Sequence, residues 1–475
     1  MRQSFHKNSE VVEVALVGPP YSADPIDYDA FVHHVAFRSV YSSVVTQYRI
    51  GSFTGILVDS WRADDTFKNW EFHVRKGMRF ENGDLISPDT IVRSWVRLAF
   101  LMKQKSSHSA FFDVLDGAET LTSPTSSISG LSCDAEKITI RLKASTKNLL
   151  DTLSFGLYAV VHPNDYDVVT GKWRDSHAVT ASGPYRIAKW NQESIELNRR
   201  SVYPPEVGHG RPIQTIRMVW DVKHRISADM VMGNSIDTDA RDNHMFYGGA
   251  NSSIAYARCR SWRSPTSPCY DKATRVALRE AYYAEIEKLG YKVTRSFFPL
   301  AIKGIRELSS PTLAGLDGHG PRAVKFAHAQ IPNPLFKAFN EAAPNAIEKL
   351  DLIPDKIEVP FATFMKEYDQ ALSNYMADIY MLATGILIED PMDDVRFMFL
   401  SREGIRLPDT DGSIHAELQR PAPDLQRINA LLWDQAVVWP IMHYASGFWA
   451  KETIDFSLIN LVLPPTDFQW LGWKQ

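Results

Sequence analysis

The stretch WEFHVRKGMRFENGDLISPDTIVRSW, residues 70–95, carries the clearest local signals in the chain. Its first residues alternate between apolar and polar side chains, Trp70, Phe72 and Val74 against Glu71, His73 and Arg75. A period of two is typical of a half-buried β-strand. Asn82-Gly83 then predicts a tight turn. Ser87 predicts a helix N-cap, with Pro88 at the first helical position. We therefore expect a strand, a turn and a helix in that order.

The rest of the chain alternates between strand and helix signals in a way that predicts an α/β fold. The run VVEVALV, residues 11–17, predicts a strand buried on both faces that ends at Gly18. Residues 31–45 carry apolar side chains at helical spacing and predict a helix. Further helices are expected over residues 272–289, 334–350, 361–374 and 424–437, and further strands over residues 137–143, 185–187, 195–197, 323–327, 355–359 and 378–382.

Length and composition exclude several classes of protein. The chain has 475 residues, which at roughly 150 residues per domain suggests about three domains. With 52 basic and 56 acidic residues the net charge is -4, which disfavours a general electrostatic DNA binder. Neither a membrane-spanning apolar run nor a secretory h-region is found in the sequence. This leaves two readings, a cytoplasmic protein or an exported protein whose signal has been removed.

Side chains that could carry chemistry are few. There is no GxSxG elbow, HExxH, GxGxxG or Walker A loop. One cluster of acidic residues consists of Glu389, Asp390, Asp393 and Asp394. These carboxylates could hold Mg²⁺ or Ca²⁺, as in a metal-dependent hydrolase, or they could be the solvated start of a helix. Neighbouring helical side chains such as His33 and His34 point about 100° apart and cannot chelate one metal ion together. We expect no catalytic residue, no metal and no cofactor.

The cysteines are Cys133, Cys259 and Cys269, with no CxxC pair among them. This excludes zinc-ribbon and thioredoxin-like motifs. Cys259 and Cys269 are close enough in sequence to close a small loop as a disulfide, or they are two reduced thiols.

Residues 70–95 resemble the signature of the family 5 extracellular solute-binding proteins, the periplasmic oligopeptide, dipeptide and nickel-chelate binders that serve ABC importers. The positions that match the family pattern are Phe72, Arg75, Gly77, Phe80, Gly83, Asp84, Ser87 and Ser94. Other segments resemble the family in the same order along the chain: Val14 to Pro25, Leu57 to Trp61, Ser182 to Tyr185, Pro268 to Ala281, Phe361 to Asp378, and Asp390-Pro391.

The resemblance implies a two-lobed periplasmic binding protein fold, with mixed sheets around a hinged ligand cleft. It implies domain I over residues 1–45, 178–225 and 445–475, domain II over 46–177 and domain III over 226–444. The signature would then hold domain II together and take no part in the ligand site. An exported protein also favours a Cys259–Cys269 disulfide with Cys133 free.

The function implied by the resemblance is that of a non-catalytic, periplasmic protein. It would capture a small, peptide-like or other ligand and deliver it to the permease subunits of an ABC importer. We expect a monomer that binds no nucleic acid, with its signal peptide absent from this sequence. The alternative is a transporter-independent ligand sensor or carrier with the same fold.

The sequence departs from the peptide-binding members of the family at the ligand anchor. Thr384 and Leu387 stand where those members have a Trp and the Asp that pairs with the peptide's α-ammonium group. Leucine cannot stabilise a buried cation, so either the ligand has no free amine there or another acid supplies the charge.

Arginines offer a second departure from the family. Trp262-Arg263 replace a common Phe-Asn, and Arg263 is expected either to select an anionic ligand or to form a surface ion pair. Arg241 is expected either to serve an anionic ligand or to pair locally with Asp239 or Asp242. His443 and Tyr444 lie near the return to domain I, where they either face the cleft or pack at the hinge. The predicted ligand-binding residues are Tyr21, Phe155, Trp262, Arg263, Thr384, Leu387 and Tyr444.

Overall fold

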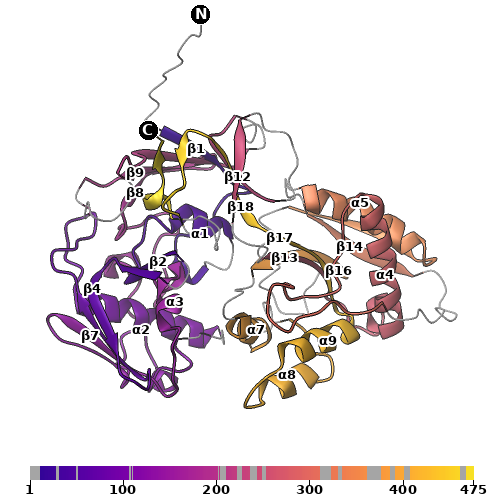
Figure 1. Ribbon diagram of the computed structural model, residues 1–475, viewed down its shortest axis with the longest axis horizontal. Helices are drawn as coiled ribbons and strands as arrows, with labels where there is room; N and C mark the ends of the chain where they lie inside the picture. The colour runs from indigo at the N-terminus through magenta and orange to yellow at the C-terminus, as the bar shows by residue number, and fades with distance from the viewer. Residues whose placement is uncertain are drawn as a thin grey trace, which may run out of the picture. The chain divides into compact units, whose positions relative to one another are not determined.

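The computed structural model describes residues 11–27, 31–49, 52–105, 109, 111–201, 203, 210–221, 227–235, 243–248, 253–310, 322–329, 334–360, 376–385, 391–400, 407–459 and 467–474 (Figure 1). The chain forms two compact units. Unit 1 comprises Met1–Met232, Ala240–Gly248 and Gly447–Gln475, and unit 2 comprises Gly233–Asp239 and Gly249–Ser446. The division of the chain into domains I, II and III stays a prediction.

Unit 1 is built on a seven-stranded sheet in the order β12-β18-β11-β1-β10-β9-β8. β1 pairs in parallel with both β10 and β11, so it has neighbours on both sides. Val12, Val14 and Ala15 are fully buried, which explains the apolar run of the first predicted strand. The strands are β1 (Val11–Ala15), β8 (Tyr185–Trp190), β9 (Ser194–Arg199), β10 (Thr215–Val219), β11 (Met230–Asn234), β12 (His244–Gly248) and β18 (Ser446–Lys451).

The signature stretch folds as predicted. In β5 (Asn69–Val74) the side chains of Trp70, Phe72 and Val74 are buried, and those between them are not. Helix α2 (Pro88–Gln104) follows, with Trp95 fully buried beneath it. β5 lies in a second sheet of order β4-β5-β7-β6, with β4 (Val58–Ala63), β6 (Leu131–Cys133) and β7 (Lys137–Arg141). Smaller elements of unit 1 are α1 (Phe31–Phe37), α3 (Leu149–Ser154), β2 (Val45–Arg49), β3 (Ser52–Gly55), β19 (Ile454–Asp455) and β20 (Gly472–Trp473).

Ser87 begins α2 with a reciprocal capping box. The Thr90 backbone N–H donates to Ser87 Oγ at 3.2 Å, and the Ser87 backbone N–H donates to Thr90 Oγ1 at 3.4 Å. Ser87→Ala is expected to lower the free energy of unfolding by about 1 kcal/mol, because it leaves an N-terminal amide of the helix without its acceptor. Denaturant unfolding measures the loss. Ser87→Asp keeps an acceptor and should retain most of the stability, and equal losses in both variants would contradict the capping role.

The helix predicted over residues 31–45 is too long. α1 ends at Phe37, and Val45 already begins β2. The residues between them make non-local contacts instead: the Ser42 backbone N–H donates to Ser182 Oγ at 3.0 Å, and the Val160 backbone N–H donates to the Ser42 carbonyl at 2.9 Å. The apolar spacing there reflects burial of a connecting segment, because tertiary contacts override a weak helical preference.

Gly183 allows a close approach of two backbone segments in unit 1. Its N–H donates to the Val40 carbonyl at 2.8 Å. A Cβ at this position would lie 2.6 Å from the Ser39 carbonyl oxygen and 2.7 Å from the Val40 carbonyl carbon. Because both obstacles are backbone atoms, only glycine fits.

Unit 2 is built on a five-stranded sheet in the order β15-β14-β16-β13-β17. β14 runs parallel to β15 and β16, and β13 runs antiparallel to β16 and β17. The strands are β13 (Ser253–Cys259), β14 (Ala323–Ala329), β15 (Ile353–Val359), β16 (Ile379–Gly385) and β17 (Val438–Tyr444), and the helices are α4 (Lys272–Lys288), α5 (Pro334–Glu348), α7 (Pro391–Leu400), α8 (Ser413–Leu418) and α9 (Leu425–Gln435).

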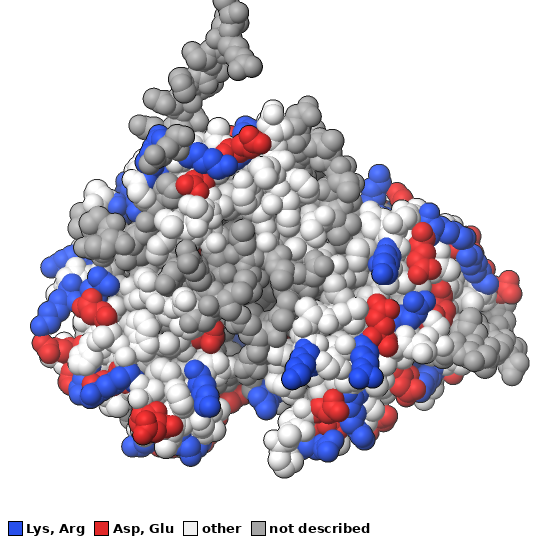
Figure 2. Space-filling view, viewed as in Figure 1, with Lys and Arg blue, Asp and Glu red and all other residues white. Residues whose placement is uncertain are grey.

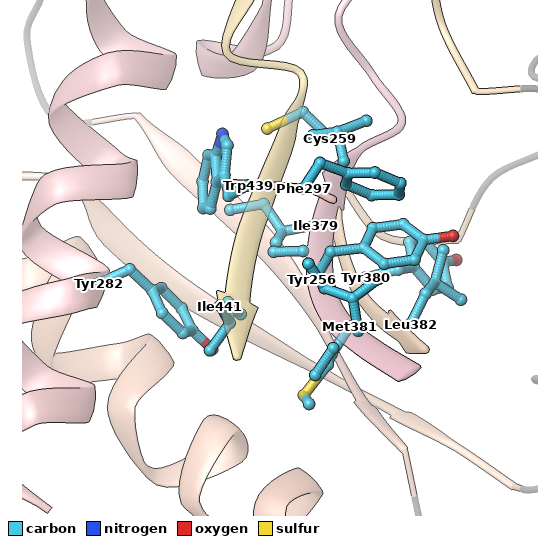
Figure 3. Packing of buried hydrophobic residues seen from close by; sticks show 14 of the residues in the cluster. Tyr256, Cys259, Tyr282, Phe297, Ile379, Tyr380, Met381, Leu382, Trp439 and Ile441 are labelled. Atoms are coloured by element: carbon cyan, nitrogen blue, oxygen red, sulfur yellow. The ribbon is translucent and has the colours of Figure 1, made fainter. Parts of the chain in front are cut away.

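The core of unit 2 is a single hydrophobic cluster that joins α4 to the sheet. Figure 3 shows Tyr282 of α4 and Trp439 of β17 within this cluster, with their ring centroids 6.1 Å apart. Asp271 caps α4, as the sequence predicted, by accepting the Thr274 N–H at 2.7 Å. The helix predicted over residues 361–374 lies outside the described residues.

Candidate ligand-binding site

The strand ends of unit 2 meet at one edge of its sheet. Since β14, β15 and β16 are parallel and β13 is antiparallel to β16 and β17, the carboxyl ends of four strands lie beside the amino end of β13. In open α/β sheets, ligands bind outside the carboxyl ends of the strands. We therefore take this edge, which we call the unit 2 strand-end edge, as the candidate site in unit 2.

Two predicted site residues, Thr384 and Tyr444, lie at the unit 2 strand-end edge. Ser253 is the ladder partner of both Tyr444 and Gly385, and Ile254 is the partner of both Thr384 and His443. The Ser253 hydroxyl lies 2.9 Å from the Ser446 hydroxyl. The structure thus places Thr384 and Tyr444 at the same edge but on opposite faces of the sheet, because successive residues of a strand alternate in direction. Tyr444 shares its face with Ser253.

Tyr444 and His443, at the end of β17, are neutral at physiological pH. Burial raises the pKa of Tyr444 to about 12, so its phenol keeps its proton. Burial also lowers the pKa of His443, and its Nε2 donates to the Ser296 carbonyl at 3.0 Å. Tyr444, His443 and the serines offer hydrogen bonds to a ligand but no charge.

Trp262 and Arg263 lie at the other end of the sheet. They follow the last residue of β13, Cys259, and the ladder continues in that direction because the Arg260 N–H donates to the Asp378 carbonyl at 2.8 Å. A seven-residue strand spans about 20 Å, which separates this pair from Tyr444. The Arg263 guanidinium lies 4.6 Å from the centre of the Trp262 ring and is exposed.

Leu387, Glu389, Asp390 and Arg241 lie outside the described residues. Of the acidic group, Asp393 and Asp394 fall at the start of α7. Within the described ranges, no group of three or more His, Cys, Asp or Glu side chains is placed to hold a metal ion. In the same part of the chain, no helix is long and apolar enough to cross a membrane.

In unit 1 the loop after β1 presents Tyr21 at the carboxyl ends of β1 and β10. The Tyr21 side chain is 39% exposed, so its ring is available for contact with a ligand. The backbone around it is fixed: the Ala23 N–H donates to the Ser176 carbonyl at 3.1 Å, and the Tyr41 hydroxyl donates to the Ala23 carbonyl at 3.0 Å. A rigid loop that carries one exposed aromatic ring suits a preformed binding surface.

The buried side chain of His33 contacts both the backbone and the ring of Tyr21. Its Nε2 accepts the Tyr21 backbone N–H at 3.2 Å, and the two rings meet edge to face with centroids 4.2 Å apart. The acceptor role needs a neutral imidazole, and burial lowers the pKa of His33 to about 4. The only sign of this role in the sequence is a histidine among the apolar residues of a predicted helix.

A buried ion pair ties the same loop to α2. Arg97 binds both carboxylate oxygens of Asp24 and donates from Nε to the Gly171 carbonyl at 2.7 Å. Its guanidinium lies 4.8 Å from the Tyr166 ring centre and 5.1 Å from that of Trp173. The position of Tyr21 therefore depends on α2 as well as on α1.

Phe155, the other predicted site residue in unit 1, follows α3. Its carbonyl accepts the Ser43 hydroxyl at 3.2 Å, and its partly buried ring packs against the core around α2. The structure gives Phe155 a packing role. A ligand contact for Phe155, as for the other predicted site residues, stays a prediction.

Comparison with known proteins shows which family part of this chain is similar to. Residues 52–219 match the model of the bacterial extracellular solute-binding proteins, family 5, in its middle region. The match covers residues 52 to 219 of the 475-residue chain. The matched residues run from β3 to β10 and include the whole signature stretch, so the resemblance stated from residues 70–95 is confirmed.

A curated relative of this chain is the dipeptide-binding protein DppE of Bacillus subtilis (strain 168). The two are 22% identical over 199 residues, which is 41% of this chain and 33% of the relative. The match therefore spans about a third of the length of DppE.

Solved structures share the fold over nearly the whole of this chain. The murein tripeptide binding protein MppA of Escherichia coli has a TM-score of 0.76 at 14% identity, covering 98% of each chain. OppA of Haemophilus influenzae, solved with the peptide RPPGFSPFR, has a TM-score of 0.76 at 12% identity and covers 98% of this chain and 99% of its own. A substrate binding protein of Microbacterium hydrocarbonoxydans, solved with 4-hydroxybenzoate hydrazide, has a TM-score of 0.68 at 15% identity and covers 96% of this chain and 99% of its own. The periplasmic binding protein fold expected from the sequence is confirmed.

Proposed function

We propose that this chain is an extracellular, non-catalytic solute-binding protein that delivers a small ligand to the permease subunits of an ABC importer. The observation that carries the proposal is the family match over residues 52–219. The fold shared with MppA and OppA over 98% of the chain supports it, because MppA is a murein tripeptide binding protein and OppA was solved in complex with a peptide. The ligand contacts are proposed to lie at the unit 2 strand-end edge and at Tyr21.

We propose that the protein holds its ligand without the carboxylate that pairs with a peptide's α-ammonium group in the peptide-binding members. Leu387 stands where the peptide-binding members have that carboxylate. At the unit 2 strand-end edge, Tyr444 and His443 are neutral groups that can donate or accept hydrogen bonds. An ammonium group buried beside them without a counter-charge would cost several kcal/mol, an order-of-magnitude estimate.

Calorimetry with a mixed peptide pool and with the same peptides N-acetylated tests this ligand class. We expect acetylation to change the affinity less than about tenfold, whereas removal of an amine anchor would cost a hundredfold or more, at about 1.4 kcal/mol per tenfold. If free-amine peptides bind and acetylation abolishes binding, an acid elsewhere supplies the anchor. If neither set binds, mass spectrometry of the ligand released from the purified protein by denaturation identifies the class.

Tyr21→Ala is expected to weaken binding of that same ligand by about tenfold, because a rigid, exposed aromatic ring contributes on the order of 1–2 kcal/mol at a contact. Tyr270→Ala is the matched control, since Tyr270 is also exposed, at 53%, but lies beyond the opposite end of β13. Titration calorimetry of both variants measures the effect. Equal affinities for the two variants would exclude Tyr21 from the site.

A further inference from the structure

Cys259 and Cys269 are two buried thiols in the core of unit 2. The structure holds both as free thiols, so the disulfide hypothesised from the sequence is not present in it. Cys259 ends β13, where its N–H donates to the Val437 carbonyl at 2.9 Å. Both side chains are 0% exposed and belong to the same hydrophobic cluster, in which Figure 3 labels Cys259.

The segment between the two cysteines folds back on itself. The Ser264 N–H donates to the Ser261 carbonyl at 2.8 Å, the Ser267 N–H donates to the Ser264 carbonyl at 3.0 Å, and the hydroxyls of Ser261 and Ser267 lie 2.6 Å apart. Ser267 then accepts the Cys269 N–H at 3.1 Å and donates to the Asp378 carboxylate at 2.9 Å. These bonds close the loop and bring Cys269 back to the end of β13.

The thiols are neighbours that can influence each other. Burial, and after it the side-chain hydrogen bond with Cys269, raises the pKa of Cys259 well above its ordinary value. A raised pKa keeps the sulfur in its thiol form, and complete burial denies it to an oxidant in solution. Cys133, by contrast, is exposed on β6 in unit 1.

We propose that Cys259 and Cys269 are a modification site, a disulfide pair that is oxidised while the chain folds and is protected from oxidation once unit 2 has formed. The oxidant is a disulfide, either a small molecule or a dithiol oxidase. One cysteine thiolate attacks the oxidant's disulfide and releases one of its thiols, and the other cysteine thiolate then attacks the mixed disulfide and releases the second. Two protons leave the cysteines and two electrons pass to the oxidant. The bond would join the end of β13 to the short turn Pro268–Tyr270 that precedes α4.

Refolding tests the proposal. The reduced, denatured chain is refolded in oxidised glutathione, and native reduced protein is held in the same buffer for the same time. We expect the refolded chain to be two hydrogen atoms lighter, with Cys133 as its one alkylatable thiol after denaturation. Its unfolding midpoint should be higher by about 5–10 °C until a reductant is added, as a loop of this length predicts. The native sample should keep all three thiols.

Controls separate the pair from other thiols. Cys133→Ser should still lose two hydrogen atoms on refolding, whereas Cys259→Ser and Cys269→Ser should not. Three alkylatable thiols in the refolded wild type, or a disulfide to Cys133, would overturn the pairing. Equally fast oxidation of the native sample would overturn the protection. These measurements on the wild type decide the question even if the Cys259 and Cys269 variants fail to fold.

Discussion

Arg97→Met is expected to lower the free energy of unfolding of unit 1 by about 3–5 kcal/mol. Arg97 and Asp24 are 1% and 4% exposed. Removal of the guanidinium leaves a carboxylate buried without a counter-charge. Burial already raises the pKa of Asp24 against the lowering effect of Arg97, so the pair is held together at a considerable desolvation cost. The hydrogen bond to Gly171 and the contacts with Tyr166 and Trp173 would be lost with it.

A matched control lies one turn away on the same helix. Arg93 pairs with Asp89 at 2.7 Å, but these side chains are 64% and 59% exposed. Arg93→Met should therefore cost less than about 1 kcal/mol. Hydrogen exchange of the α2 amides, together with denaturant unfolding, measures both variants. The double variant Asp24→Leu, Arg97→Met should recover much of the loss, because no buried charge remains. Equal losses for Arg97→Met and Arg93→Met would contradict the role of the buried pair.

The second large effect concerns pH. The pKa of His33 in the folded protein is about 4, against an ordinary value of 6.5. The unfolded chain therefore takes up a proton on this residue at a higher pH than the folded chain does. The resulting stability is fully present above pH 6.5 and is lost progressively as the pH falls towards 4. A difference of about 2.5 pKa units corresponds to roughly 3 kcal/mol.

His33→Gln isolates this contribution because glutamine retains an acceptor for the Tyr21 N–H and does not titrate. Relative to this variant, the wild type should lose about 3 kcal/mol of unfolding free energy between pH 6.5 and 4. His177→Gln serves as the control, since the His177 side chain is 57% exposed, and its pH profile should follow that of the wild type. Parallel profiles for wild type and His33→Gln would show that His33 does not titrate as its burial requires.

Local signals explain which parts of the fold were predictable. The alternation in β5 and the Ser87 cap of α2 depend only on residues that are adjacent in sequence, and both elements lie where they were expected. The segment after Phe37 shows the opposite case. Its apolar spacing resembles a helix, but its partners, Val160 and Ser182, lie more than a hundred residues away. No local pattern reports such contacts.

The candidate site follows the same division. Thr384 and Tyr444 share an edge because strand order and direction place them there. Strand direction can be predicted in part from the sequence of alternating strands and helices. Trp262 was grouped with them because of a resemblance, although it follows the opposite end of β13. The support of Tyr21 by His33, and of Asp24 by Arg97, was missed because a buried histidine or arginine looks no different in sequence from an exposed one.

Gly248 pairs with Gly447 in the ladder between β12 and β18, and this pairing determines where the chain can be shortened or circularly permuted. Gly248 precedes the long segment of unit 2, Gly249–Ser446, and Gly447 follows it. The two glycines are direct partners on antiparallel strands, about 5 Å apart. Residues 249–446 therefore occupy the place of an ordinary hairpin loop. A two-residue turn can replace them to leave unit 1 as a shorter protein, and the same strand pair offers a natural point for circular permutation. Apart from the short segment Gly233–Asp239, unit 2, which has a core of its own, has in effect the topology of an inserted domain.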